Sequence, residues 1–465
     1  MGISNTLAGA PSKPYAIPPE PPLPMPFQTM LWVQRPTEMM EMCLRQYGSA
    51  FTLALAPFRI SLFSDPESIR TIFAAKPDEM HAGEVNRILR TLVGQDSVLL
   101  LDGQEHLRHR KLLMPSFHGE RMRFYGDTMV EITRDVMARW PEGQQITLHD
   151  HTQEITLQVI LRTVFGADAG PDEQKLGDQI KHMLAAAENR LAIMPMVFLA
   201  DRKHLENKAP FKWLLARRNA VDATIFEQIA RRRSDPGLAQ RKDVLSMLLG
   251  ARDDEDQGMT DVELRDELMT ALAAGHETTA TGLAWAMERL LSNPATYDRL
   301  RDEVRTCGDA PAPEQLAALP YLDATVKEVL RLRPVVPLVG RVLKKDTRLG
   351  GYDMPAGTAV GACIYLAHRN PNVYPEPDQF KPERWLGVTP DPTTWLPFGG
   401  GIRRCVGAAF ALYEMKIVLG TMLAARDFEL AQPKDARVRR RAITFWPEGG
   451  TRLRTRKRVP LRRAA

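Results

Sequence analysis

Cys405 lies in a ten-residue segment, Phe398–Gly407, that combines one thiol with several glycines and two arginines. The segment reads Phe-Gly-Gly-Gly-Ile-Arg-Arg-Cys-Val-Gly and is followed by a helix-forming run of Ala, Phe and Leu. A thiol binds metal only as thiolate, and neighbouring cations and a helix N-terminus both favour the anion. Glycines allow a flat, bulky group to approach the backbone. The segment therefore predicts a thiolate ligand for a metal in a bulky cofactor, of which haem iron is one.

The segment resembles the cysteine-ligand loop of the cytochrome P-450 haem-thiolate monooxygenases, whose pattern is F-x-x-G-x-R-x-C-x-G. Phe398, Gly401, Arg403, Cys405 and Gly407 occupy its five fixed positions. The alternative is a buried inert cysteine beside a turn, which is how most free cysteines behave. The resemblance implies haem b with Cys405 as the iron ligand and the other four residues in contact with the cofactor.

The length of 465 residues would ordinarily divide into two or three domains. No linker, repeat or low-complexity stretch separates two halves, which favours one large domain. The four cysteines form no C-x-x-C pair, so neither a disulfide scaffold nor a zinc site is indicated. A signal-peptide pattern and a membrane-spanning apolar run are both lacking, which predicts a cytoplasmic protein of the soluble bacterial type without a membrane anchor.

Sequence patterns also predict the organisation of the chain. We expect a proline-rich leader at 1–30, the haem-thiolate domain at 31–450 and a basic tail at 451–465. Eight prolines between residues 11 and 26 predict extended polyproline II structure on the surface. Two strands, 50–56 and 58–63, are predicted before a long, mostly helical region.

The C-terminal region 437–463 holds eleven Lys and Arg residues and a single acid, Glu448. Residues 443–451 predict a hairpin that turns at Pro447–Gly450. The basic residues after it indicate a solvated end, and the alternative is a docking surface for an acidic electron donor. Nucleic-acid binding is not predicted, because neither interleaved aromatic residues nor a known module accompanies the charge.

A long helix is predicted from Thr260 to Asn293, with a capping box at its start. Glycine and two threonines lie in its middle, at Ala274–Thr279, although they weaken a helix. The segment matches the family motif A-G-x-(D/E)-T-T, which implies that Glu277 and Thr278 deliver protons to the reaction. The alternative is a helix kink with a solvent-facing glutamate. His276 falls on the variable position of the motif and is not predicted to bind metal.

Three charged residues are expected to be scaffold rather than chemistry. Glu328 and Arg331 are spaced i, i+3, and Arg384 follows in a Pro-Glu-Arg-Trp segment. Alone, the first two would be an ordinary surface pair. In the resembled family, such residues form a buried salt-bridged triad before the cysteine loop, and removing one member strands the others.

The propionates of haem require cations. The resemblance assigns this role to His106, Arg110, Arg341 and Arg403. The family often has tryptophan at the first of these positions, and this chain has histidine there. The alternative for His106 and Arg110 is an amphipathic basic helix. Arg108 and Lys111 are expected to lie in solvent.

The resemblance also places six residues around the substrate: Ala273, Ala274, Val336, Leu338, Ile443 and Thr444. All but Thr444 are apolar, and several are small. Residues 81–101 and 193–199 are expected to form the roof. Arg87, Arg90 and Lys203 are candidates for binding a substrate carboxylate. A largely apolar pocket predicts a lipophilic substrate such as a fatty acid, a terpenoid or a polyketide.

These features together predict the cytochrome P-450 fold, mainly α-helical with a small β-rich region. The resemblance implies a monomeric monooxygenase that uses dioxygen and receives electrons from NAD(P)H through a separate ferredoxin or flavodoxin and its reductase. One alternative is a haem-thiolate peroxygenase or isomerase, which the Glu277–Thr278 pair disfavours. The other is a haem sensor or ligand-binding protein without catalysis.

Overall fold

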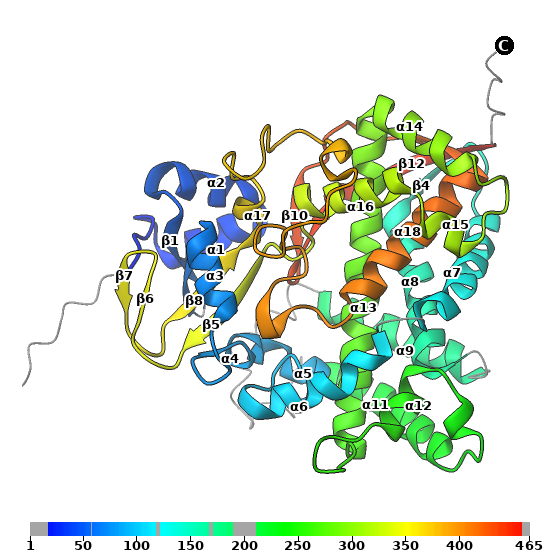
Figure 1. Cartoon of the computed structure of the whole chain (residues 1–465), viewed down its shortest axis with the longest axis horizontal. Helices are drawn as coiled ribbons and strands as arrows, with labels where there is room; N and C mark the ends of the chain where they lie inside the picture. The colour runs from blue at the N-terminus through cyan, green and yellow to red at the C-terminus, as the bar shows by residue number, and fades with distance from the viewer. Residues whose placement is uncertain (1–16, 57, 118–120, 167–170, 189–210, 458–465) are drawn as a thin grey trace, which may run out of the picture.

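A 32-residue helix, α13 (Asp261–Ser292), passes through the helical part of the structure (Figure 1). This computed structural model describes residues 17–56, 58–117, 121–166, 171–188 and 211–457. At the start of α13, the side chain of Thr260 accepts the N–H of Glu263, and the Glu263 carboxylate accepts the N–H of Thr260. Pro294 begins the next helix, so α13 ends where the sequence predicts.

The helices packed around α13 are α8 (Leu148–Phe165), α11 (Phe211–Arg233), α16 (Pro320–Leu332) and α18 (Ala408–Ala425). Leu272, Leu283 and Trp285 of α13 have no exposed surface and belong to the main hydrophobic core. Burial of such side chains stabilises a fold by about 1.5–3 kcal/mol each. The long helix is therefore the element against which most of the helical part is packed.

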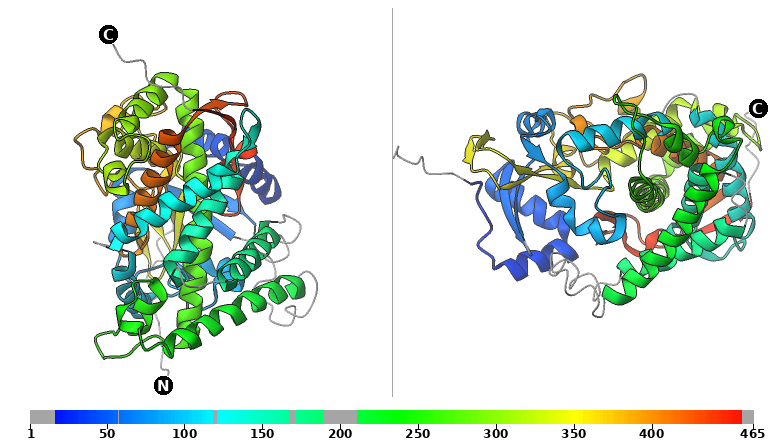
Figure 2. Two further views of the ribbon diagram at one scale, coloured as in Figure 1. Left: turned by 90° about the vertical axis from the view of Figure 1, so that its right-hand side faces the viewer. Right: turned by 90° about the horizontal axis from the view of Figure 1, so that it is seen from below.

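The strand-rich part lies to one side of these helices, as Figure 2 shows from below. Its five-stranded sheet has the order β1-β2-β8-β5-β3. The strands are β1 (Ala50–Leu55), β2 (Phe58–Phe63), β8 (Ala359–Cys363), β5 (Leu338–Leu343) and β3 (Met80–His81). Strands β1 and β2 pair as an antiparallel hairpin, with Leu55 opposite Phe58, so the two predicted strands are confirmed.

Further helices, all shorter than α13, pack on one part or the other. The helices are α1 (Met25–Gln34), α2 (Pro36–Tyr47), α3 (Pro66–Ala74), α4 (Gly83–Asn86), α5 (Arg90–Val93), α6 (Gly103–Leu113), α7 (Arg121–Ala138), α9 (Pro171–Glu188), α12 (Val244–Gly250), α14 (Pro294–Arg305), α15 (Pro313–Ala317) and α17 (Ile364–Ala367). A further hairpin joins β6 (Thr347–Leu349) to β7 (Tyr352–Met354).

The described end of the proline-rich segment lies along β1. The Thr52 N–H donates to the carbonyl of Pro19 at 2.8 Å, and the Thr52 hydroxyl donates to that of Pro18 at 2.8 Å. Pro18 and Pro21 are buried, where a surface segment was expected. Because proline keeps its carbonyl as an acceptor, the segment satisfies donors of the neighbouring edge strand β1.

The C-terminal strands correct two predictions. The hairpin is formed by β10 (Val438–Arg441) and β11 (Thr444–Pro447), and it turns at Ala442 instead of Pro447–Gly450. Ala442 has a φ of 51°, a left-handed conformation that a glycine or asparagine usually marks in a sequence. The expected solvated tail forms β12 (Arg452–Lys457), the middle strand between β4 (Gln145–Thr147) and β9 (Arg426–Leu430).

Among the described residues, α18 is the one helix that is long and apolar enough to cross a membrane. Most of its surface is buried inside the fold, against α13, α16 and neighbouring helices. Its composition is therefore accounted for by its position in the core.

Glu328, on α16, has no exposed surface and accepts hydrogen bonds from four residues. Arg331 donates to it twice at 2.8 Å, Arg384 at 3.1 Å and the Trp385 indole at 2.9 Å, and the N–H of Lys381 donates at 2.9 Å. The other Arg331 donors bind backbone carbonyls between residues 368 and 379. The structure thus places the predicted triad together and ties α16 to the segment that leads to Cys405.

Arg108 does not lie free in solvent, contrary to the prediction. It donates to Asp253 at 2.6 Å and to Glu263 at 2.8 Å, and so joins α6 to the loop before α13. Arg108 departs from the prediction because the carboxylates of Asp253 and Glu263 both lie within reach of its guanidinium, which can pair with two carboxylates at once. Lys111 is 62% exposed and pairs with the surface carboxylate of Asp254.

His109 makes a second, buried link between α6 and α13. Its side chain is 3% exposed, with Nδ1 2.8 Å from Glu267 and Nε2 3.1 Å from Glu263. Burial alone would lower the pKa of His109, but the hydrogen bonds and charges of the two glutamates outweigh it and the pKa is raised. Glu267 also accepts the N–H of Val98, so the same link holds the segment before α6.

We expect Glu328→Gln to lower the free energy of unfolding by about 3–5 kcal/mol, because it leaves the buried Arg331 without its counter-charge. Thermal unfolding followed by circular dichroism measures the effect. Arg348→Ala is the control: this arginine is 70% exposed and its pair with Asp353 lies on the surface hairpin, so the change should stay within about 0.5 kcal/mol. Equal effects of the two substitutions would contradict the scaffold role.

The raised pKa of His109 gives a pH-dependent contribution to stability. The contribution is fully present below about pH 6.5, the ordinary histidine pKa, and is lost as pH rises through the raised value. We therefore expect the difference in Tm between the wild type and His109→Gln to shrink as pH increases. Melting curves at a series of pH values test this, with the exposed His182→Gln as control. A difference that stays constant or grows with pH would contradict the assignment.

Candidate active site

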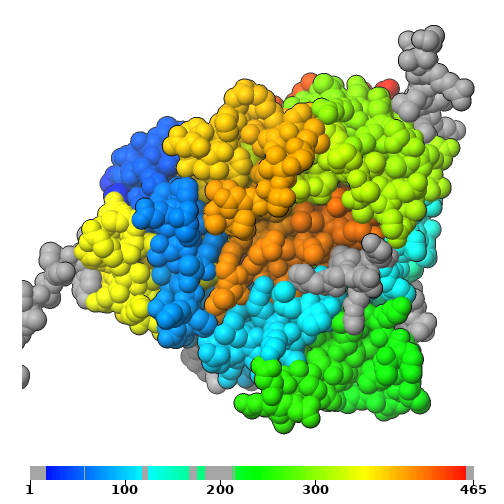
Figure 3. All heavy atoms as spheres, in the orientation of Figure 1, coloured from blue at the N-terminus to red at the C-terminus, as the bar shows by residue number. Residues whose placement is uncertain are grey.

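The loop that carries Cys405 is held by its own backbone and by a close contact with α3. The N–H of Cys405 donates to the carbonyl of Phe398 at 3.0 Å, and the Phe398 ring lies 5.9 Å from that of Trp395. Gly401 has a φ of 63°, and a Cβ there would lie 1.9 Å from the Phe73 carbonyl oxygen. Both the positive φ and the close contact with Phe73 therefore require glycine at position 401. In Figure 3 this part of the chain (orange) crosses the middle of one face, beside the blue segment of α3 and the cyan segment of α6.

Cys405 is the only exposed cysteine of the four. Burial by surrounding protein nevertheless raises the pKa of its thiol, outweighing the Gly407 N–H and the cations of Arg110 and Arg404, which act in the opposite direction. A thiol that is both accessible and enclosed lies in a recess. The cations and the N–H at the start of the helical run therefore favour the thiolate, as expected, but burial outweighs them, and the charge of a bound metal would favour ionisation further.

Gly407 begins the helical run after the ligand. Its φ is −85°, a value open to any residue, and a Cβ there would meet no protein atom within 4 Å. Nothing in the protein itself therefore requires glycine at this position. A flat group lying against the loop would require it, which is the fit expected for a porphyrin.

Basic side chains from three segments approach one another beside this loop. They are His106 and Arg110 on α6, Arg341 on β5 and Arg403 in the loop. Burial, followed by the charges of the three arginines, lowers the pKa of His106 to about 3. Burial and repulsion by Arg403 lower the pKa of Arg341 to about 10. The four residues predicted to bind the propionates are thus close enough to perturb one another.

This cluster is short of negative charge and of hydrogen-bond acceptors. Nδ1 of His106 is buried with no partner in the described part of the chain. Arg341 is 6% exposed and donates to the carbonyl of its own neighbour, Gly340, at 2.7 Å. Buried cations are costly unless they are paired. The two carboxylates of a haem would pair them, so the residues present fit this cofactor.

Arg403 has one partner that the sequence does not indicate. Its guanidinium donates to the carboxylate of Asp102 at 2.5 Å and to the carbonyls of Val98, at 3.1 Å, and Leu101. These three acceptors come from the segment that enters α6, about 300 residues earlier in the chain. Since neither residue type nor spacing relates them, sequence reasoning could not pair them.

The weakened segment of α13 stays helical, and its side-chain hydroxyls bond back to the helix. Thr278 Oγ1 donates to the carbonyl of Ala274 at 2.7 Å, and Thr279 Oγ1 donates to that of Gly275 at 3.0 Å. Ala274 is exposed although it lies in the middle of a core helix. His276 is buried, with Nδ1 2.9 Å from the carbonyl of Leu272, and burial lowers its pKa. The helix therefore leaves Ala274 exposed and Thr278 partly exposed, and keeps His276 in the core.

Glu277 faces α8 and the C-terminal hairpin. Gln153 donates to its carboxylate at 2.5 Å, His149 Nε2 lies 3.6 Å away and Arg441 Nε 3.9 Å away. Burial would raise the pKa of Glu277, but the nearby His149 and the charge of Arg441 outweigh it, and the pKa is lowered. The carboxylate is therefore ionised and 19% exposed. Its partners are distant in sequence and were not predicted.

The predicted substrate-contacting residues lie on segments that the structure brings together. The N–H of Phe445 donates to the carbonyl of Val335 at 2.7 Å, and the indole of Trp285 on α13 donates to the carbonyl of Phe445 at 2.8 Å. Residues 336–338 and 443–444 adjoin these anchoring points in sequence, whereas Ala273 and Ala274 lie about three turns before Trp285 on α13. Ile443 is 42% exposed at the hairpin turn.

Thr444 differs from the other predicted contacts because its hydroxyl is already used. It is 3% exposed and donates to the carbonyl of Arg441 at 2.8 Å, across the turn. Val336 and Leu338 are half-buried. Of the predicted roof, residues 193–199 and Lys203 lie outside the described part of the chain. Arg87 is exposed and Arg90 is half-buried, and their role toward a substrate stays a prediction.

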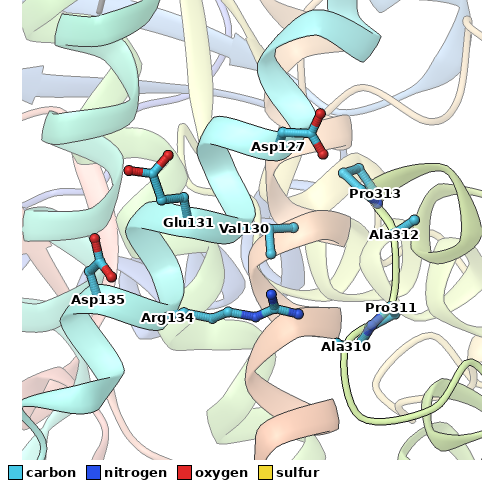
Figure 4. Close-up of a pocket in the computed structure, with 9 residues that line it drawn as sticks. All are labelled: Asp127, Val130, Glu131, Arg134, Asp135, Ala310, Pro311, Ala312 and Pro313. Carbon is cyan, nitrogen blue, oxygen red and sulfur yellow. The ribbon is translucent and has the colours of Figure 1, made fainter.

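A surface pocket of about 390 Å³ lies elsewhere, between α7 and residues 310–313 (Figure 4). In this view Arg134 points toward Ala310 and Pro311 and Asp127 lies beside Pro313, whereas Glu131 and Asp135 point away from this loop. None of the predicted site residues lines this pocket. We therefore assign the chemistry to the Cys405 recess.

The family model described as Cytochrome P450 matches residues 18–448. A protein of Mycobacterium tuberculosis (strain ATCC 25618 / H37Rv) that carries the name cytochrome P450 135B1 is 41% identical over 442 residues, which cover 95% of this chain and 91% of the relative. Another from the same strain, cytochrome P450 138, is 35% identical over 459 residues, covering 98% of this chain and 100% of the relative.

Two solved structures share the fold. The heme domain of cytochrome P450DA has a TM-score of 0.82 at 25% identity and covers 96% of this chain and 99% of that one. The retinoic-acid-bound cyanobacterial CYP120A1 has a TM-score of 0.78 at 24% identity, covering 96% and 100%. The predicted fold, mainly helical with a small β-rich region, is confirmed. This chain belongs to the cytochrome P450 family of haem-thiolate monooxygenases.

Proposed function

We propose that this enzyme inserts one oxygen atom of dioxygen into a lipophilic substrate, with Cys405 as the iron ligand. The observation that carries the proposal is the accessible thiol of Cys405 beside His106, Arg110, Arg341 and Arg403. Among the described residues, a carboxylate partner, Asp102, is found for Arg403 and for no other member of this cluster. Haem b supplies both what the thiol requires, a metal ion, and what the cluster requires, two carboxylates. Electrons would come from NAD(P)H through a separate ferredoxin or flavodoxin and its reductase.

The cofactor would be held from two directions. Cys405 would ligate the iron, with Gly401 and Gly407 keeping the loop close to the ring and Phe398 supporting the loop from behind. His106, Arg110, Arg341 and Arg403 would bind the propionates. When bound, haem would supply the activation of dioxygen and the oxidising power, and a thiolate ligand from Cys405 would favour cleavage of the O–O bond.

Thr278 and Glu277 would supply the protons. The hydroxyl of Thr278 holds its proton toward the carbonyl of Ala274, at 2.7 Å, and still has lone pairs with which to accept another donor. Glu277 is partly exposed and ionised, so it can take up protons from solvent and rotate away from Gln153. Arg441 and His149 hold the carboxylate when it is charged and release it when it is neutral.

The residues proposed to surround the substrate favour a lipophilic molecule. Ala273, Ala274, Val336, Leu338 and Ile443 offer only hydrocarbon, and the Thr444 hydroxyl is engaged by Arg441. Such a lining is typical of fatty-acid, terpenoid or polyketide binding. Two small alanines on α13 leave room for a bulky group near the oxidising centre.

The electron donor is proposed to be acidic. Arg404, next to the ligand in sequence, is exposed, and Arg110 lies beside it and donates to its carbonyl at 2.5 Å. Positive charge at this place would steer an acidic partner toward the haem edge. We further propose that the protein acts as a monomer in the cytoplasm. The predicted division into residues 1–30, 31–450 and 451–465 changes at its last boundary, because residues 452–457 form β12 and so belong to the folded domain.

Titration of the purified ferric protein with fatty acids, terpenoids and macrolides tests the substrate class. We expect the Soret band to shift from the low-spin to the high-spin position with one of these classes, as the ligand displaces axial water. Absence of any Soret band, or a band unchanged by Cys405→Ala, would contradict the role of Cys405. A haem-loaded protein that responds to none of the classes would contradict the proposed substrate class alone.

We expect Thr278→Ala to uncouple electron consumption from product formation, since it removes the hydroxyl that relays protons. Product formation should fall by roughly 100-fold while NAD(P)H is still consumed and hydrogen peroxide accumulates. NAD(P)H, peroxide and product are measured in one assay with a surrogate ferredoxin and its reductase. Thr279→Ala is the matched control, because Thr279 makes the same back-bond one residue later but is buried.

Glu277→Gln should slow proton delivery, because an amide cannot take up a proton. Turnover of this variant should therefore show a larger solvent isotope effect than turnover of the wild type. If Thr278→Ala stayed coupled and peroxide alone supported full turnover, the peroxygenase alternative would replace this proposal.

A further inference from the structure

Asp102 places a carboxylate at the edge of the proposed propionate site. One of its oxygens accepts the N–H groups of Ala82, at 2.9 Å, and Gly83, at 3.0 Å, together with the guanidinium of Arg403 at 2.5 Å. The Asp102 side chain is 14% exposed and that of Arg403 is 10% exposed. Solvent screens such a pair poorly, so the charge of Asp102 acts on its neighbours.

The charges of the site balance only when Asp102 is included. Arg110, Arg341 and Arg403 carry three positive charges, whereas His106, with a pKa of about 3, is neutral at pH 7. A haem would add two propionates. Asp102 adds the third negative charge, and its effect on Arg341 opposes the lowering of the arginine pKa.

Asp102 belongs to a group that also includes His81 and Glu84, whose ligand atoms lie within 4.8 Å of one another. A metal ion is not needed to explain this group. Glu84 is already paired with His81 at 2.8 Å and with Lys344 at 2.8 Å, and Asp102 is paired with Arg403. These carboxylates therefore act through the protein cations that they already hold.

We propose that Asp102 is a positioning residue that acts through Arg403 to keep the reduction potential of the haem low. The inference rests on the proposed propionate site. Asp102 holds the Arg403 guanidinium toward residues 98–102 and cancels one of the three arginine charges. Adding an electron to the haem is opposed by nearby negative charge and favoured by nearby positive charge. Removal of the Asp102 charge should therefore make the haem easier to reduce.

Asp102→Asn isolates the charge, because the amide oxygen can still accept the N–H groups of Ala82 and Gly83. The reduction potential of the haem-loaded protein is measured by spectroelectrochemical titration, with and without 0.5 M salt. We expect the potential to shift upward in Asp102→Asn, with little change on adding salt, since the pair is mostly buried. Glu84→Gln is the matched control: it removes a charge from the same group, but one that is paired with Lys344 rather than with a propionate-site arginine.

Arg341→Gln separates this inference from the propionate site on which it rests. Loss of that cation should lower the potential and speed the transfer of haem to apomyoglobin. If Arg341→Gln behaves so and Asp102→Asn leaves the potential unchanged, or shifts it no more than Glu84→Gln does, the role of Asp102 is wrong and the site stands. If neither variant changes potential or haem retention, the propionate site itself is wrong. A purely structural Asp102 would lower Tm in the Asn variant at constant potential.

Discussion

A carboxylate with no access to water must be satisfied by the protein, and Glu328 is satisfied by donors from two stretches of chain some fifty residues apart. All five N–H donors of Arg331 are used as well, two on Glu328 and three on carbonyls between residues 368 and 379. This network fixes an irregular segment whose own backbone hydrogen bonds are mostly short-range turn bonds, such as those from Val373 and Tyr374 to Asn370. The segment leads directly to the Cys405 loop, so the position of the ligand depends on a pair of charges far from the chemistry.

The site is assembled from segments that contribute one or two side chains each. Gly401 brings the ligand loop against the carbonyl of Phe73, and Arg403 joins the same loop to the residues before α6. His109 and Arg108 then join α6 to the start of α13, the helix that carries Glu277 and Thr278. The ligand side and the proton-delivering side of the site are thus connected by a continuous set of buried polar contacts. Removing one member of such a network leaves the others buried without partners, which costs more than replacing the whole network with apolar groups. The ionisable groups buried here are therefore kept as a complete set.

The sequence predicts those parts of the molecule whose signals lie in contiguous residues. The Cys405 loop, the Ala274–Thr279 segment and the capping box of α13 are local patterns with local physical causes. The partners of Glu277 and Arg403 come from α8, β10 and the residues before α6, and no spacing rule relates them. The C-terminal hairpin was misplaced because its turn is made by Ala442 in a left-handed conformation, whereas Pro447–Gly450, with its typical turn residues, forms only the connection to β12. The strand β12 alternates between exposed and buried side chains: Arg452, Arg454 and Arg456 face solvent, and Leu453 and Thr455 are buried. The many basic residues obscure this pattern in the sequence.

The place of β12 has a consequence for how the chain folds during synthesis. This strand lies between β4, which is made about 300 residues earlier, and β9. The three-stranded sheet therefore cannot form until β12 is in place. On a ribosome, most of the helical part can pack while residues 452–457 are still inside the exit tunnel, but the edges of β4 and β9 stay open until these residues have left it. Unpaired edges invite association between nascent chains. Slow emergence of residues 452–457 would therefore favour aggregation before the sheet is complete.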